Sequence, residues 1–376
     1  MMAMSPSSVP RNDDEAARST LRTQALTDRI RFGDVRRYAR AVRTQLPKRL
    51  ASGAQYIVLI GVLLAFVMVS MVWPMVDDLF SGDTDAADLG IIAIALIAPL
   101  TVLVVWVWLC VRLIRQDRRR YRLSRFAADN GWRYDPWLPT SWYHGMYAMP
   151  GAVEDVFDRT VIPGPAPIEV ATYRGTTGTG KSRTIRQTDY VRVQLGVVLP
   201  HIVLDARAND RPFGRTNLPI GLTSDQRLIP EGPFADAFRL YCPSGYERDA
   251  LYLFPPDVLA VMLDHARDLD VEIVDDTLYL CAPKNVVSTD PQRWQSLLTT
   301  VEAITAKARQ WEAWRDDRLV PDSADPLNRP MGVAPAGRRL RQRFEWWWLV
   351  GGILVLGFGL YSLISDFVSW LMSLGS

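Results

Sequence analysis

The chain is poor in cysteine, histidine and lysine. Its 376 residues include three cysteines, three histidines and four lysines against 39 arginines. The cysteines and histidines are scattered without a CxxC or HxxxH pair, which excludes a disulfide framework and a zinc site of ordinary ligand spacing. The net charge of +2 excludes a globally basic nucleic-acid-binding protein and a globally acidic one. We therefore expect no metal, no cofactor and no nucleic-acid partner.

Three long runs lack charged residues. They cover 56–76, 89–111 and 346–365, which are 21, 23 and 20 positions long. A helix rises about 1.5 Å per residue, so about 20 apolar residues cross a hydrocarbon core roughly 30 Å thick. A buried core helix is the competing interpretation, but runs of this length favour membrane spans. The sequence thus predicts an integral membrane protein with three transmembrane helices.

Basic residues flank these runs asymmetrically. Eleven Lys or Arg precede the first run, whereas the loop 77–88 has five Asp and no basic residue. Arginines follow the second run and precede the third, and none follows the third. Because positively charged segments stay on the cytoplasmic side, we expect a multi-pass plasma (inner) membrane protein. Its N-terminus and main domain would be cytoplasmic and its C-terminus external.

This topology predicts the domain organisation. Residues 1–55 form a cytoplasmic tail with a basic amphipathic helix at 34–47, whose stripe is Val35, Tyr38, Val42 and Leu46. That helix either lies on the inner leaflet or only carries topology-setting charge. The other segments are transmembrane helices 56–76, 89–111 and 346–365, an acidic external loop 77–88, a cytoplasmic domain 112–318, a linker 319–343 and an external tail 366–376.

The domain 112–318 shows patterns typical of an α+β fold. Alternating apolar residues predict strands at 168–172 and 191–199, short strands at 201–205 and 250–254, and a hairpin turning at Asp275–Asp276. Residues 135–167 predict irregular loop. Helices are expected at 256–269 and from Pro291, the second with a stripe of Trp294, Leu297, Val301, Ile304, Ala308 and Trp311. Adjoining strands without helical crossovers predict a mainly antiparallel sheet with helices to one side.

Several stretches carry a family resemblance. They are 126–132 (FAADNGW), 226–234 (QRLIPEGPF), 238–242 (FRLYC), 250–257 (ALYLFPPD) and 271–280 (VEIVDDTLYL). With them the chain resembles a family of uncharacterised, mainly actinobacterial membrane proteins. The resemblance implies hydrophobic N-terminal helices followed by a cytoplasmic α+β domain of unknown function, and it brings no catalytic residues.

One motif matches a phosphate-binding loop. Gly175, Gly180, Lys181 and Ser182 satisfy the pattern G-x-x-x-x-G-K-[ST], in which backbone amides and the lysine hold phosphates. That chemistry needs a buried strand before the loop and a helix directly after it. Here alternating strands stand on both sides, so a hairpin tip with 175–189 as its loop is the favoured interpretation. Nucleotide binding stays as the alternative.

A run of arginines follows the second apolar run. We expect these residues to contact anionic lipid headgroups of the inner leaflet; they are Arg115, Arg118, Arg119, Arg120, Arg122 and Arg125. The sequence therefore favours a membrane-anchored cytoplasmic interaction, scaffold or sensing module with a protein partner. The alternative is a membrane-tethered enzyme, using either Gly175–Ser182 or the turn Cys242–Asp249, where a thiol stands near a hydroxyl and charges.

Overall fold

The computed structural model describes residues 21–46, 59–63, 65–66, 70, 86–139, 143–229, 232–310 and 333–342. The chain divides into two compact units. The first consists of Met1–Tyr143, Ala148–Gln194 and Cys281–Glu302, and the second of His144–Tyr147, Leu195–Leu280 and Ala303–Ser376. Strand β4 (Thr184–Ala206) begins in the first unit and ends in the second.

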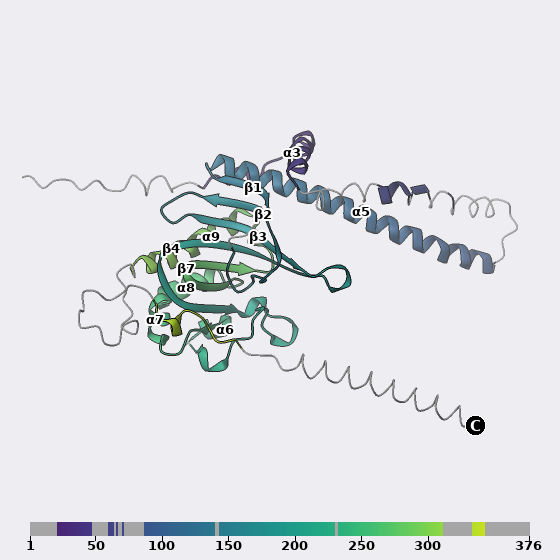
Figure 1. Ribbon diagram of the computed structural model, residues 1–376. Helices are drawn as coiled ribbons and strands as arrows, with labels where there is room; N and C mark the ends of the chain where they lie inside the picture. The colour runs from purple at the N-terminus through teal and green to yellow at the C-terminus, as the bar shows by residue number, and fades with distance from the viewer. Residues whose placement is uncertain are drawn as a thin grey trace, which may run out of the picture. The chain divides into compact units, whose positions relative to one another are not determined.

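The first unit contains an antiparallel sheet (Figure 1). β1 (Arg133–Leu138) pairs with β2 (Val153–Ile162), β2 with β3 (Ile168–Thr177), and β3 with the first part of β4. The loop predicted at 135–167 is therefore wrong at 135–138 and 153–162. Its Pro, Asp and Arg residues hid two strands, whose polar side chains pair across the sheet: Arg159 lies 3.0 Å from Asp135 and 2.9 Å from Glu169.

Helices α2 (Gln24–Thr27), α3 (Phe32–Gln45) and α5 (Ala86–Asp129) also belong to the first unit. The predicted amphipathic helix exists as α3, but its apolar side does not face outward. Val35 and Val42 are buried, α3 contacts α5, and Tyr38 packs on Tyr121 with ring centroids 5.6 Å apart. Burial against α5 thus disfavours the interpretation in which the stripe of α3 lies on a leaflet.

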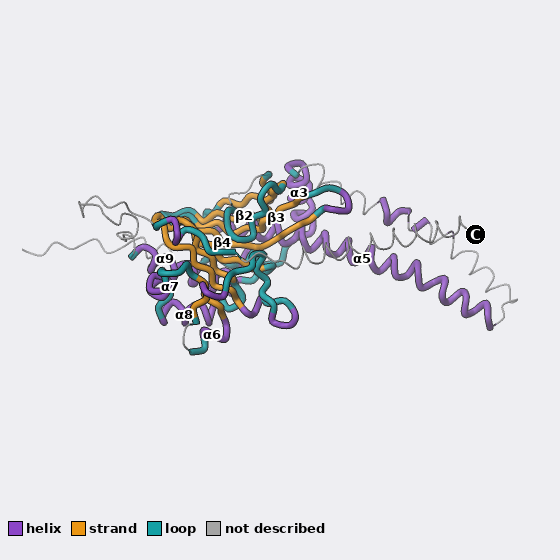
Figure 2. Tube along the Cα trace, turned by 60° about the horizontal axis from the view of Figure 1, so that its bottom comes forward, coloured by secondary structure: helices purple, strands orange, loops and turns teal. Residues whose placement is uncertain are grey.

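The predicted integral membrane fold is wrong for the described part of the chain, because none of its helices is both long enough and apolar enough to cross a bilayer. The second predicted span, 89–111, lies inside α5, which has 44 residues and continues into arginine-rich sequence. In two views α5 extends beyond β2 and β3 of its unit (Figures 1 and 2). The first predicted span lies mostly, and the third entirely, outside the described residues.

In the second unit, the last part of β4 pairs with β6 (Phe238–Tyr241), which pairs with β5 (Arg227–Leu228). β7 (Asp270–Ala282) also pairs with β4. The helices are α6 (Phe234–Ala237), α7 (Glu247–Leu253) and α8 (Pro256–His265). Short 3-10 turns occur in the described chain at Gly180–Ser182, Arg207–Asn209, Pro212–Gly214, Ser224–Gln226 and Pro335–Gly337.

Two predictions fail in the second unit and one succeeds. The strand predicted at 250–254 is helical, in α7. The hairpin predicted at Asp275–Asp276 is wrong, since both residues lie inside a single strand, β7, in which Asp275 has a left-handed φ of 53°. Helix α8 begins at Pro256 as predicted and buries Met262.

Helix α9 (Pro291–Arg309) also confirms the prediction made from its spacing. Five members of its predicted stripe are buried: Trp294, Leu297, Val301, Ile304 and Ala308. The sixth, Trp311, lies outside the described residues. A three-and-four spacing of apolar residues therefore identified both the helix and its buried face.

Candidate anion-binding site

A cavity lined almost entirely by arginine lies in the first unit. Its volume is about 500 Å³. Its lining residues come from α5, from the connection between α2 and α3, and from the loop between β7 and α9; they are Arg29, Ile30, Arg115, Arg118, Arg119, Arg122 and Thr289. The lining thus brings together five guanidinium groups and no carboxylate.

The rotation of α5 is set by Arg120. The Nε–H group of Arg120 donates to Oδ1 of Asp158 on β2 at 3.1 Å, and both side chains are buried. The hydroxyl of Tyr134 donates to the same oxygen at 2.9 Å. Because residues three and four apart share a helix face, fixing Arg120 toward the sheet leaves Arg115, Arg118, Arg119 and Arg122 together on another face.

Arg29 is brought to α5 by backbone contacts. Asn130 accepts a hydrogen bond from the Arg22 amide and donates one to its carbonyl, both at 3.0 Å. Buried Ala25 and Leu26 seat α2, which contacts α5. An Nη–H group of Arg122 then donates to the Asp28 carbonyl at 3.2 Å. Because Arg29 directly follows Asp28, these contacts hold Arg29 at the edge of the cavity.

The loop that carries Thr289 is held by two side chains. Asp189, buried on β4, accepts hydrogen bonds from the amides of Val286 and Val287 at 3.2 and 3.4 Å. Burial raises the pKa of this carboxyl above its usual range. The indole N–H of Trp294 donates to the Ser288 carbonyl at 2.8 Å. The loop is therefore anchored at the three residues that directly precede the cavity-lining threonine.

The cavity arginines are poorly neutralised. Within the described chain, neither Arg115 nor Arg118 makes an ion pair, and an Nη of Arg119 stands 3.7 Å from Asp158. The Nε atoms of Arg119 and Arg122 are buried and have no hydrogen-bond partner in that part of the chain. The lining therefore carries more positive charge than its carboxylate partners neutralise.

Four of the five cavity arginines belong to the run that the sequence predicts to contact lipid headgroups, and that contact stays a prediction. Arg115, Arg118, Arg119 and Arg122 line the cavity, whereas Arg120 pairs with Asp158 and Arg125 lies outside the lining. Arg29 and Thr289 were missed. Arg29 is distant in sequence from α5, and only tertiary packing brings it near, so local spacing held no signal for it.

The P-loop match lies at the tip of a β-hairpin. β3 and β4 pair antiparallel from Ile168–Val193 to Thr177–Thr184. Between them stands a single 3-10 turn, Gly180–Ser182, after which Arg183 is extended again. The hairpin prediction is confirmed, with a shorter loop than expected. Lys181 and Ser182 are exposed, and no α-helix follows to orient amides toward one phosphate.

The candidate enzyme site at Cys242–Asp249 lacks an activated nucleophile. Cys242 is 1% exposed, and burial raises the pKa of its thiol to about 12. The thiolate is the reactive form of cysteine, so this thiol stays protonated at neutral pH. Glu247 and Asp249 begin helix α7 and add to the upward pKa shift by their charge.

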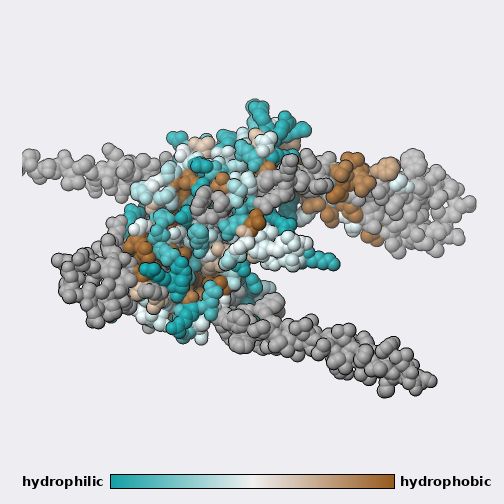
Figure 3. Space-filling view, viewed as in Figure 1, coloured by the Kyte–Doolittle hydropathy of each residue, from teal (hydrophilic) through white to brown (hydrophobic). Residues whose placement is uncertain are grey.

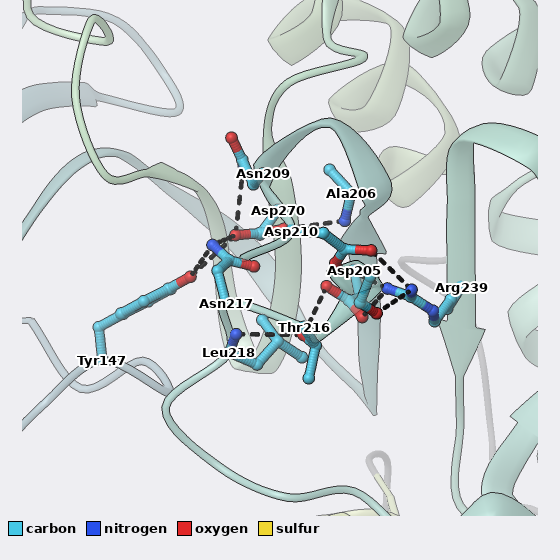
Figure 4. Close-up of polar contacts among 11 residues, drawn as sticks. Tyr147, Asp205, Ala206, Asn209, Asp210, Thr216, Asn217, Leu218, Arg239 and Asp270 are labelled. Carbon is cyan, nitrogen blue, oxygen red and sulfur yellow. Dashed lines mark hydrogen bonds and ion pairs between the residues drawn. The ribbon is translucent and has the colours of Figure 1, made fainter. Parts of the chain in front are cut away.

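A second polar cluster, in the second unit, is connected by hydrogen bonds and ion pairs (Figure 4). Asp270 is fully buried and accepts hydrogen bonds from the Tyr147 hydroxyl at 2.8 Å, the Asn217 amide at 2.9 Å and the Ala206 backbone N–H at 2.8 Å. Burial raises the pKa of Asp270 to about 6. Beside it, Arg239 joins Asp205 and Asp210 at 2.8 and 2.7 Å. These contacts connect loop residues to the strands β4, β6 and β7.

Comparison with known proteins adds a structural likeness. No family model and no curated protein matches the chain, so the resemblance to an actinobacterial family stays a prediction. Among solved structures, the crystal structure of the mycobacterial trehalose monomycolate transport factor A, TtfA, is similar over 51% of this chain and 94% of that chain, with 12% identity and a TM-score of 0.34. A likeness at this level carries no argument about fold or function here.

Proposed function

We propose that this protein is an interaction module that binds phosphate-bearing anions in the arginine cavity of its first unit. The observation that supports the proposal is the lining itself: five arginines and one threonine surround about 500 Å³ without a carboxylate. Ligand pockets for small molecules commonly enclose about 300–1,000 Å³. The cavity therefore has room for a ligand group larger than a single phosphate.

The chemistry of the lining suits phosphate. A guanidinium group is planar and donates two parallel hydrogen bonds to a phosphate or carboxylate. Five arginines line the cavity, and charge-assisted hydrogen bonds from guanidinium groups to phosphate are about twice as strong as neutral ones. Thr289 adds a neutral hydroxyl that is able to donate or accept.

Ordinary solvated arginines are the competing explanation. That explanation leaves a cost unexplained, because like charges three or four apart on a helix destabilise it by about 0.2–0.5 kcal/mol per pair. Arg115, Arg118, Arg119 and Arg122 form four such pairs, and Arg29 adds a fifth charge from outside the helix. An anion that neutralises them converts this repulsion into binding free energy.

The proposal is tested by titration calorimetry of the full chain with inorganic pyrophosphate at low ionic strength. Arg118→Ala should weaken binding at least about tenfold, since one charge-assisted hydrogen bond is worth about 1.5–3 kcal/mol. Arg183→Ala is the matched control, because Arg183 is exposed in the same unit and lies outside the cavity lining. Absence of pyrophosphate binding, or equal weakening by both variants, would refute the proposal.

A further inference from the structure

An exposed apolar stripe continues the arginine face along α5. Ile97, Leu100, Val104, Trp108 and Val111 precede Arg115, Arg118 and Arg122 in steps of three and four. At 3.6 residues per turn, this spacing puts all eight on one side of the helix. The face of α5 that carries these arginines is therefore apolar for several turns before them.

The side chains of this stripe are open to solvent. Ile97, Leu100, Val104 and Trp108 are between 57% and 59% exposed. Figure 3 shows hydrophobic side chains gathered where α5 and the described residues 59–63 and 65–66 lie in Figure 1. Contiguous exposed apolar surface is uncommon in proteins and marks a binding site for a partner or ligand.

A cation–π contact lies on α5 between the apolar stripe and the cavity arginines. The guanidinium of Arg112 lies 5.4 Å from the ring centroid of Trp108, within cation–π range. Indole rings are favoured where one end of a side chain meets hydrocarbon and the other meets polar groups. The order along α5 is thus apolar surface, an indole with a cation, and then the arginine cavity.

We infer that the ligand is an anionic amphiphile, with a phosphate-bearing head in the arginine cavity and a hydrocarbon chain along the stripe from Val111 to Ile97; this inference rests on the proposed function. The stripe is about 21 Å long at 1.5 Å per residue. One leaflet of a hydrocarbon core, which is the reach of an acyl chain, is about 15 Å. A free phosphate compound would neutralise the arginines and leave the stripe uncovered.

The test compares two soluble probes on the full chain by calorimetry. One is glycerol 3-phosphate, the head alone, and the other is dihexanoyl phosphatidate below its micelle concentration. Burial of two chains should make phosphatidate bind at least about tenfold tighter. Dihexanoyl phosphatidylcholine, which has the chains but no net charge, should bind at least about tenfold more weakly than phosphatidate.

Two variants test where the hydrocarbon chain of the ligand lies on α5. Val111→Ser, at the cavity end of the stripe and within reach of a hexanoyl chain, should reduce the phosphatidate advantage several-fold and leave glycerol 3-phosphate binding unchanged. Val102→Ser is the matched control, because Val102 is exposed on another side of α5. Equal affinity for the two phosphates would overturn the inference and leave the proposed function standing. Binding of neither would overturn the proposed function itself, and equal effects of the two valine variants would overturn the placement of the chain.

Discussion

The indole ring of Trp294 on α9 packs against the ring of Phe126 on α5, with the centroids 4.9 Å apart. Trp132 completes the cluster, 5.1 Å from Phe126 and 5.9 Å from Trp294. Because the Trp294 indole also donates to the Ser288 carbonyl, one side chain holds both α5 and the loop beside Thr289. Two walls of the arginine cavity therefore share an anchor.

Replacing this anchor should affect stability and binding together. Trp294→Ala is expected to lower the free energy of unfolding by about 3–5 kcal/mol, through lost packing and the cavity left behind. In the fraction that stays folded, pyrophosphate affinity should fall several-fold, since the Thr289 loop loses its hydrogen bond. Urea unfolding and calorimetry measure the two effects.

Leu297→Ala is the control for this experiment. Leu297 is buried on the same helix, so its truncation should cost about 2–5 kcal/mol while the Ser288 hydrogen bond remains. If Leu297→Ala weakens pyrophosphate binding as much as Trp294→Ala does, the loss of affinity comes from the general loss of packing. The hydrogen bond to Ser288 would then have no specific effect on binding.

Repulsion among the cavity arginines predicts that removing one stabilises the ligand-free protein. Arg118→Gln eliminates the like-charge pairs with Arg115 and Arg122, so the free energy of unfolding should rise by about 0.4–1 kcal/mol at low salt. The gain should vanish in about 1 M salt, where the Debye length is about 3 Å. A stabilisation that persists at high salt, or a loss of stability at low salt, would contradict this origin.

Stability should fall as pH rises through the titration of Asp270. The folded pKa of this carboxyl is raised to about 6 by burial, above an unfolded value of about 3.9. The folded state thus holds the proton more tightly, and its stabilising contribution is complete below about pH 4 and lost by about pH 6. The loss amounts to about 3 kcal/mol.

Asp270→Asn isolates this contribution. An amide does not ionise in this range, so the difference in unfolding free energy between wild type and variant should change between about pH 4 and 6 and stay constant above. The variant should also be less stable at pH 4, because its NH₂ group faces the donors of Tyr147 and Asn217. A pH-independent difference would refute the raised pKa.

The tip of the β3–β4 hairpin should depend on Gly178 and tolerate loss of Lys181. Gly178 has a φ of 71°, and a Cβ there would stand 2.5 Å from the Ser182 carbonyl oxygen. Gly178→Ala should therefore cost about 1–3 kcal/mol. Lys181→Ala removes an exposed charge and should change stability by less than about 0.5 kcal/mol. Nucleotide-dependent stabilisation that Lys181→Ala abolishes would restore the P-loop interpretation.

Periodicity predicted those elements whose burial follows one simple repeat. The sequence predicted the buried stripe of α9 and the start of α8 at Pro256 because apolar residues recur every three or four positions after a proline. β1 and β2 were missed because they hold polar residues that find partners in the fold: Asp135 pairs with Arg159, and buried Asp155 accepts from the Trp137 indole at 3.0 Å. A hydrophobic pattern does not record polar groups that find partners in the fold.

The site was predicted in part for a similar reason. The spacing of Arg115, Arg118, Arg119 and Arg122 places them on one helix face, and that much is local. Local spacing did not distinguish Arg120 from the cavity arginines, because its partner Asp158 lies on β2, far away in the sequence. Arg29 and Thr289 reach the cavity through Asn130, Asp189 and Trp294, long-range contacts that a single sequence does not reveal.

The most direct measurement follows the Nε–H resonances of arginine by NMR during a pyrophosphate titration. Arg119 and Arg122 line the cavity, so the resonances of both should shift on binding. The Nε–H group of Arg120 already donates to Asp158, so its resonance should not shift. Saturable shifts of Arg119 and Arg122, lost in Arg118→Ala and kept in Arg183→Ala, are the predicted result. Unmoved Arg119 and Arg122 resonances at saturating pyrophosphate would contradict the account.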